Sequence, residues 1–187
     1  MPTDQQSALR PEYPIRTARL LLRPLTNDDV DALLAYRSRP DVCRYVPFEP
    51  MTREAMIERL ASHYANTELT DEGQSLTLGF EIARTGELIG DVVLFWHSRK
   101  HGGGEIGYVM HPDFRGHGYA TEAARAVIER GFRAGVPEVY AVVRPGNSPS
   151  MAVCRRLGMS PLGRLRRWYD VELEAFRLTA PECGPAD

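Results

Sequence analysis

The segment between Glu105 and Gly135 constrains the fold of this chain most, because a strand, a glycine-containing loop and a helix follow one another in it. The alternating run EIGYVM (Glu105–Met110) predicts the strand. The loop HPDFRGHG leads into a helix of about fifteen residues, which Gly135 ends. The apolar face of this helix consists of Ala120, Ala123, Ala124, Val127 and Ile128. Such a face predicts a helix that packs against a sheet.

The remaining pattern predicts how the sheet is completed. Strands are expected over residues 15–25, 76–83, 87–96 and 138–143 and as a closing pair within 162–179, and helices over residues 26–37, 52–64 and 150–158. Gly86, in the turn RTGE, joins two of the strands into a hairpin. The order of elements predicts an α/β (α+β) fold: one domain over residues 15–180 with a mixed sheet and helices on both faces. Residues 1–14 are expected to be a flexible N-terminal tail and residues 181–187 a C-terminal tail.

Composition and charge exclude several classes of protein. A net charge of -2 argues against a dedicated nucleic-acid-binding protein, so no nucleic-acid partner is expected. No apolar run reaches the length of a membrane span, and the N-terminus lacks the core of a signal peptide. Cys43, Cys154 and Cys183 are scattered without zinc-site spacing, which is typical of reduced thiols. We therefore expect a cytoplasmic protein with no membrane partner and no metal.

The loop before the helix has the composition of an anion site. It contains, in order, Arg115, Gly116, His117, Gly118, Tyr119 and Ala120. Glycines allow successive backbone N–H groups to point toward one ligand. The free amides and positive dipole end of the following helix add to this, as do the charges of Arg115 and His117. The loop therefore predicts a diphosphate site.

Three kinds of phosphate-binding loop compete for this segment. A P-loop needs Lys and then Ser or Thr after its last glycine, whereas Tyr119 and Ala120 follow here. A dinucleotide fingerprint needs a third small residue, where this chain has Thr121, and it needs the first strand of a βαβ unit. A dinucleotide-binding oxidoreductase is thus the weaker rival. The pattern R-x-x-G-x-A, between a central strand and a long helix, fits the segment.

Four segments together resemble a known family. They are TARLLLRPLTNDD, GELIGDVVLF, EIGYVMHPDFRGHGYATEA and RPGNSPSMAVCRRLGM, and they span roughly residues 15–180 in this order. The chain resembles the GNAT superfamily of acyl-CoA-dependent N-acetyltransferases, in particular the type that acetylates ribosomal-protein N-termini. The resemblance implies a mostly antiparallel sheet in which the strands Glu105–Met110 and Glu138–Val143 form a splayed central pair. It is also compatible with a homodimer.

The resemblance also implies a set of cofactor-binding residues for acetyl-CoA. Main-chain groups of Val109 and Met110 would bind the pantetheine arm and the thioester carbonyl. The loop 115–120 would surround the diphosphate, and Asn147 would brace the next loop and contact the cofactor. No metal is implied.

Acetyl transfer to an amine requires a neutral amine, a donor for the oxyanion and a proton or hydrogen bond for the leaving thiolate. The family-like candidate for the thiolate is Ser150, which is also expected to cap the helix it begins. Glu105 is the candidate base, acting through water, with a glutamate in the region 168–172 as an alternative. Positioning alone could also supply the rate without a base.

The implied activity is transfer of an acetyl group from acetyl-CoA to a primary amine by direct attack in a ternary complex. The acceptor, a protein N-terminus or a small molecule, stays open. Arg39, Arg44, Arg99 and Lys100 would suit an acidic peptide, whereas Glu49, Glu105, Asp170 and Glu172 would suit a cation. The alternative is a non-catalytic acyl-CoA sensor, because residues 151–153 lack the tyrosine that many relatives use as an acid.

Overall fold

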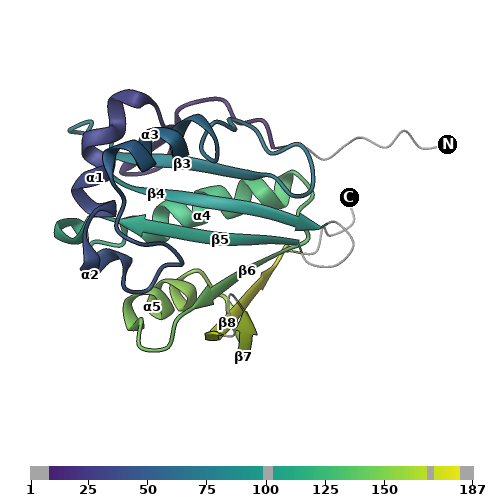
Figure 1. Ribbon diagram of the computed structural model, residues 1–187. Coiled ribbons are helices and arrows are strands. Elements are labelled where there is room, and N and C mark those ends of the chain that lie inside the picture. Colours follow the sequence, from purple (N-terminus) through teal and green to yellow (C-terminus); the bar gives the residue numbers. More distant parts are fainter. Residues whose placement is uncertain (1–8, 99–102, 168–170, 182–187) are drawn as a thin grey trace.

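The computed structural model describes residues 9–98, 103–167 and 171–181 (Figure 1). Eight strands form one sheet in the order β1-β2-β3-β4-β5-β6-β8-β7. The strands are β1 (Ile15–Arg16), β2 (Leu20–Pro24), β3 (Ser75–Ile82), β4 (Leu88–Ser98), β5 (Gly103–Met110), β6 (Glu138–Val143), β7 (Ser160–Arg167) and β8 (Val171–Thr179). The helices are α1 (Val30–Arg37), α2 (Pro40–Cys43), α3 (Arg53–Ala61), α4 (Tyr119–Arg133) and α5 (Ser148–Arg156), with 3₁₀ turns at Asn27–Asp29 and Pro112–Phe114.

The sheet is antiparallel except at its centre, where β5 and β6 run parallel. These two strands pair only at Gly104 with Val139 and at Glu105 with Tyr140. Beyond these pairs β6 turns away from β5, and the divergence is visible in Figure 1. The prediction of a mixed, mostly antiparallel sheet with a splayed central pair is confirmed.

The main core lies between the sheet and α4, which runs behind β4 and β5 in Figure 1. The predicted apolar face of α4 is buried, and Val92 and Leu94 of β4 pack in the same cluster. The helix has 15 residues, as its pattern predicts, and Gly135 follows it with a φ of 89°. A side chain with a Cβ rarely adopts this backbone conformation, which explains why a glycine lies there.

A second core lies on the other face and includes α1 and α3. Leu33 and Tyr36 of α1 and Met56 of α3 are buried there, together with Val109 of β5. α3 begins after Thr52, whose hydroxyl oxygen accepts a hydrogen bond from the backbone N–H of Ala55. Helices therefore cover both faces of the sheet, as predicted.

Three details differ from the sequence prediction. The single strand expected over residues 15–25 is two strands, because Thr17 forms a tight turn in which its hydroxyl oxygen accepts from the N–H of Leu20 at 2.9 Å. The helix expected over 26–37 begins as a 3₁₀ turn, in which Thr26 and Asp29 form a capping box. α2 was not predicted: its four residues are too few to show a periodicity, although Pro40 lies at its start.

Part of the segment expected to be a flexible tail packs against the domain. Leu9 is buried and forms a backbone bridge with Leu69, and the hydroxyl of Tyr13 donates to the carbonyl of Thr67 at 2.7 Å. These apolar and aromatic side chains gain contacts that a polar tail would lack.

Candidate active site

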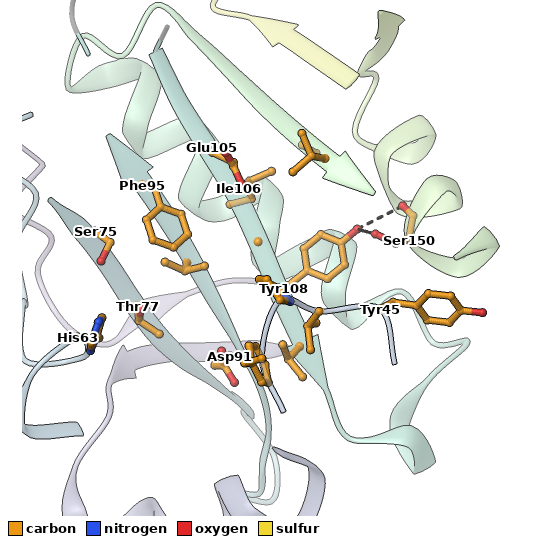
Figure 2. Close-up of a pocket in the computed structure, with 18 of the residues that line it drawn as sticks. Tyr45, His63, Ser75, Thr77, Asp91, Phe95, Glu105, Ile106, Tyr108 and Ser150 are labelled. Carbon is orange, nitrogen blue, oxygen red and sulfur yellow. Dashed lines mark hydrogen bonds between the residues drawn. The ribbon is translucent and has the colours of Figure 1, made fainter. Parts of the chain in front are cut away.

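A pocket of about 360 Å³ opens on the face of the sheet opposite α4, where β5 and β6 diverge (Figure 2). Its floor is formed by side chains from β3, β4 and β5, including Thr77, Asp91 and Phe95. The segment 45–48 and the region around α3 contribute further walls. The Tyr and Phe residues that line the pocket are Tyr45, Phe48, Tyr64, Phe95 and Tyr108.

Glu105 lies in the wall of this pocket at the last paired position of β5 and β6. Its carboxylate is buried and lies 3.1 Å from Nε2 of His97, a pocket residue on β4. The ring of His97 stacks on Phe95, with centroids 6.0 Å apart and an angle of 5° between the planes. The structure thus places the predicted base at the point where the strands separate, next to a histidine that the sequence prediction did not select.

Ser150 lies on the opposite side of the splay, in the first turn of α5. The hydroxyl of Tyr108 reaches across from β5 and shares a hydrogen bond of 2.8 Å with Ser150 Oγ (Figure 2). It also donates to the carbonyl oxygen of Ser150 at 3.2 Å. Burial raises the pKa of Tyr108 well above its ordinary value, and nearby Cys154 adds to the increase.

The N-cap of α5 is Asn147 rather than Ser150. The side-chain oxygen of Asn147 accepts a hydrogen bond from the N–H of Ser150 at 3.3 Å. The expectation that Ser150 also caps the helix is wrong, because the helix begins two residues earlier, at Ser148. The Ser150 hydroxyl is therefore available for Tyr108, and Asn147 caps the helix.

A buried ion pair closes one end of the pocket. Arg37 of α1 and Asp91 of β4 are 4% and 1% exposed and form a two-pronged contact that includes Nε to Oδ2 at 2.9 Å. The hydroxyl of Tyr36 donates to Asp91 at 2.6 Å. Burial, followed by the charge of Asp91, raises the pKa of Tyr36 well above its ordinary value. The pair joins α1 to the sheet, and its two charges neutralise each other.

The predicted diphosphate loop leaves the end of β5 and enters α4. Gly116 and Gly118 have φ values of 84° and 81°, which glycine adopts without strain. Among the hydrogen bonds of the described residues, none is donated by the backbone N–H groups of residues 116–121. Six successive free donors at the start of a helix fit the oxygens of a diphosphate.

Arg19, in the turn between β1 and β2, holds this loop in place. Arg19 donates to the carbonyl of His117 at 2.9 Å and to Glu122 of α4 at 2.7 Å, and its guanidinium lies 4.7 Å from the ring centre of Tyr119. Glu122 also accepts from the hydroxyl of Thr17 at 2.7 Å. Burial raises the pKa of Glu122, but these hydrogen bonds outweigh it and lower the pKa below its ordinary value.

The structure brings some predicted residues together and separates others. The pocket is lined by Glu105, Val109, Asn147 and Ser150. Met110 and the loop 115–120 lie beyond it, at the end of β5. Glu172 is exposed and pairs with Arg164 at 3.2 Å, outside the pocket. Arg99, Lys100 and the segment 168–170 fall outside the described residues.

Of the acceptor candidates, Arg39, Arg44 and Glu49 are exposed, and Arg39 pairs with Asp41 at 3.0 Å. Within the described ranges, no three His, Cys, Asp or Glu residues lie close enough to hold a metal ion. Among these same residues, no helix has both the length and the apolar character that crossing a bilayer requires.

The chain is similar to known acetyltransferases in sequence. A family model described as an acetyltransferase (GNAT) domain matches residues 19–160. The chain is 32% identical over 158 residues to the uncharacterized N-acetyltransferase YoaA of Bacillus subtilis, which covers 83% of this chain and 88% of that protein. It is 28% identical over 145 residues to the spermidine N(1)-acetyltransferase of Escherichia coli, with 77% and 74% covered.

Solved structures show the same fold. A GNAT-family acetyltransferase from Bacillus anthracis aligns with a TM-score of 0.78 and 24% identity over 88% of this chain and 97% of that one. RimJ of Mycobacterium smegmatis, in complex with CoA-disulfide, aligns with a TM-score of 0.74 and 24% identity over 97% and 91% of the two chains. The chain therefore belongs to the GNAT family and is an N-acetyltransferase.

Proposed function

We propose that this enzyme transfers the acetyl group of acetyl-CoA to a primary amine, by direct attack of the amine in a ternary complex. One observation carries the proposal: the pocket contains Glu105 on β5, where β5 and β6 separate, and a Tyr108–Ser150 hydrogen bond that spans the gap from β5 to α5. Acetyl-CoA, when bound, supplies the thioester that the amine attacks. The residues of the chain supply binding, orientation and proton transfer.

The backbone provides the features that coenzyme A needs. The free N–H groups of residues 116–121 bind the diphosphate, and Arg115 adds a positive charge at the same loop. Beyond Glu105, the edge of β5 that faces β6 has no strand partner. Main-chain groups of Val109 and Met110 on this strand are therefore assigned to the pantetheine amides and the thioester carbonyl. Asn147 holds the loop on the far side of the gap.

Side chains on the two sides of the gap have separate tasks. Glu105 accepts a proton from the incoming ammonium group, directly or through one water molecule, so that the amine becomes a nucleophile. Ser150 donates a hydrogen bond to the leaving sulfur. In that state the single hydrogen of the Tyr108 hydroxyl is donated to Ser150 Oγ in place of the Ser150 carbonyl, which supports the serine as a donor. This pair takes the part of the tyrosine acid that residues 151–153 do not contain.

The pocket walls suit the acceptor amine. Aromatic side chains at Tyr45, Phe48, Tyr64 and Phe95 give the pocket apolar walls that can pack the substituents of an amine. The similarity to a spermidine acetyltransferase supports a small polyamine as the acceptor. A protein N-terminus is the second acceptor type, as the resemblance in sequence implies. Both types present a primary amine on a chain that a pocket of this volume can admit only at its end.

The test combines cofactor binding with transfer. Calorimetry should show binding of acetyl-CoA, and mass spectrometry should find acetylated product when spermidine or an alanine tripeptide is added. E105Q and S150A should each lower kcat while the affinity for acetyl-CoA is retained. Absence of acetyl-CoA binding would refute the proposal, and binding without transfer to any primary amine would identify a sensor instead.

A further inference from the structure

His97 occupies an irregular position in β4. Trp96 pairs with Gly104 of β5 and Ser98 pairs with Gly103, so the register shifts and His97 is the extra residue between them. A bulge of this kind redirects a side chain and commonly lies next to an active site. His97 lies diagonally from Glu105 across the two strands, a position from which long side chains can reach each other. Here Nε2 of His97 lies 3.1 Å from a carboxylate oxygen of Glu105.

The two side chains differ in their access to solvent. The Glu105 side chain is 9% exposed and faces the pocket beside Phe95, as Figure 2 shows, whereas the His97 side chain is 43% exposed. Stacking on Phe95 keeps the imidazole plane fixed. One ring nitrogen therefore contacts the buried carboxylate while the ring reaches the rim of the pocket.

We infer that His97 relays the amine proton from Glu105 to the solvent. The inference rests on the proposed function, in which Glu105 accepts that proton. A buried carboxylate has little contact with water, so its proton needs a carrier before the next turnover. Imidazole is suited to this task because one nitrogen can accept a proton while the other releases one.

The steps balance without another reactant. An N–H bond of the substrate ammonium breaks and an O–H bond forms on Glu105. This O–H bond then breaks as Nε2 of His97 takes the proton, and the Nδ1–H bond gives a proton to water or buffer. Glu105 is again a carboxylate, and one proton has moved from the amine to the solvent. His97 is neutral with its hydrogen on Nε2, and exchange with water returns the hydrogen to Nδ1 before the next turnover.

Other charged and titratable groups face the pocket, and each has a described place. From the region of α3, Arg59, His63 and Tyr64 line it, and Arg37 and Asp91 form their own pair at its end. From β6, the hydroxyl of Tyr140, whose backbone pairs with Glu105, donates to Glu138. These groups can also change how the reaction rate depends on pH. The relay is therefore tested by chemical rescue with imidazole as well as by the pH–rate profile.

The experiment measures acetyl transfer by H97Q at about pH 7 in dilute buffer, with whichever of spermidine and the alanine tripeptide is the faster acceptor. We expect kcat to fall about tenfold to a hundredfold, because a positioned acid or base contributes a factor of this order or more. Added imidazole should restore most of this loss in H97Q and leave the wild-type rate unchanged. The rising limb of the pH–rate profile should move to higher pH in H97Q, because deprotonation must then occur without the relay.

Two further variants separate the relay from a structural role. H63Q, at another histidine in the same pocket, should show no dependence on imidazole, and H97Q/E105Q should not be rescued because the first proton acceptor is missing. Unchanged affinity of H97Q for acetyl-CoA would show that the pocket is intact.

An undiminished kcat for H97Q, or a loss that imidazole does not restore, would overturn the relay and leave the acetyltransferase assignment standing. Failure of the wild-type enzyme to acetylate any amine would instead refute the proposed function and the relay together.

Discussion

The phenolic oxygen of Tyr108 lies 2.8 Å from Ser150 Oγ, and this contact spans the gap between β5 and α5. It links the two sides of the gap between β5 and β6, next to the place that we propose for the leaving sulfur of coenzyme A. Tyr108 comes from a strand and Ser150 from a helix more than forty residues later. The fold thus brings together the two hydroxyls of the proposed proton-donating pair from segments that are distant in the sequence.

Removal of the Tyr108 hydroxyl should slow the reaction. We expect Y108F to lower kcat about tenfold to a hundredfold, because a hydrogen bond that supports developing charge contributes this order of magnitude. S150A should have a similar effect, and Y108F/S150A should lose little more than the worse single variant, since the two residues act as a unit. Steady-state assays of thiol release would measure all three.

A control for this prediction is C154S, which changes the other polar neighbour of Tyr108 without altering Ser150. The Cys154 thiol is buried, and its pKa is raised to about 11 chiefly by burial. C154S should keep the wild-type kcat. Losses that multiply in Y108F/S150A would show that the two hydroxyls act independently.

Gly118 should be required for cofactor affinity. Its φ of 81° is unfavourable for residues with a Cβ, so G118A should shift the loop and weaken acetyl-CoA binding about tenfold, equivalent to about 1.4 kcal/mol. Titration calorimetry would measure the change.

The matched control for this variant is G73A. Gly73 has a φ of 80° and open space around its Cβ position, but it lies in a turn outside the loop. Both variants should lose about 1–2 kcal/mol of unfolding free energy, because the backbone cost is the same. Only G118A should lose affinity; equal losses of affinity would assign the effect to general destabilisation.

The buried Arg37–Asp91 pair should contribute to stability only as a pair. R37M should lower the free energy of unfolding by about 3–5 kcal/mol, because Asp91 would keep an uncompensated charge in the core. R37M/D91L should recover part of this loss, since both charges are then absent. Urea denaturation would compare the variants, and a double variant that is less stable than R37M would contradict the explanation.

Glu122 should make the stability depend on pH at the acidic end. Its pKa is lower in the folded protein than in the unfolded chain, so its contribution is present above the unfolded pKa and is lost as the pH falls through the folded one. We expect the difference in Tm between wild type and E122Q to shrink as the pH is lowered from about 6 to about 3. Thermal melts across this range would measure it, and a constant difference would show that the carboxylate charge is not involved.

Local patterns predicted most of the elements correctly. The spacing of apolar residues over four turns predicts α4, its apolar face and its end at Gly135. The alternation of apolar and polar residues on both sides of Gly86 predicts the hairpin of β3 and β4. Four-residue α2 and the turn at Thr17 were missed because neither is long enough to produce a period. The predicted helix cap at Ser150 was wrong by a few residues, a distance over which several polar residues can each serve as the cap.

The candidate site residues also divide into those that a local sequence pattern reveals and those that it does not. The glycine loop and the residues Glu105, Asn147 and Ser150 could be selected because they belong to motifs of fixed spacing. Tyr108 was overlooked although it lies inside one of these motifs, since nothing in a strand pattern tells which hydroxyl it will meet. The bulge at His97 left no local signal, because it results from the pairing of two strands.

The sequence by itself determined the class of the fold, the position of the glycine loop before α4 and the membership of the family, because periodicity and motif spacing are properties of neighbouring residues. The tertiary structure decided which side chains meet: His97 with Glu105, Tyr108 with Ser150, and Arg37 with Asp91. Each of these contacts joins different elements, and strand register and helix placement set its distance.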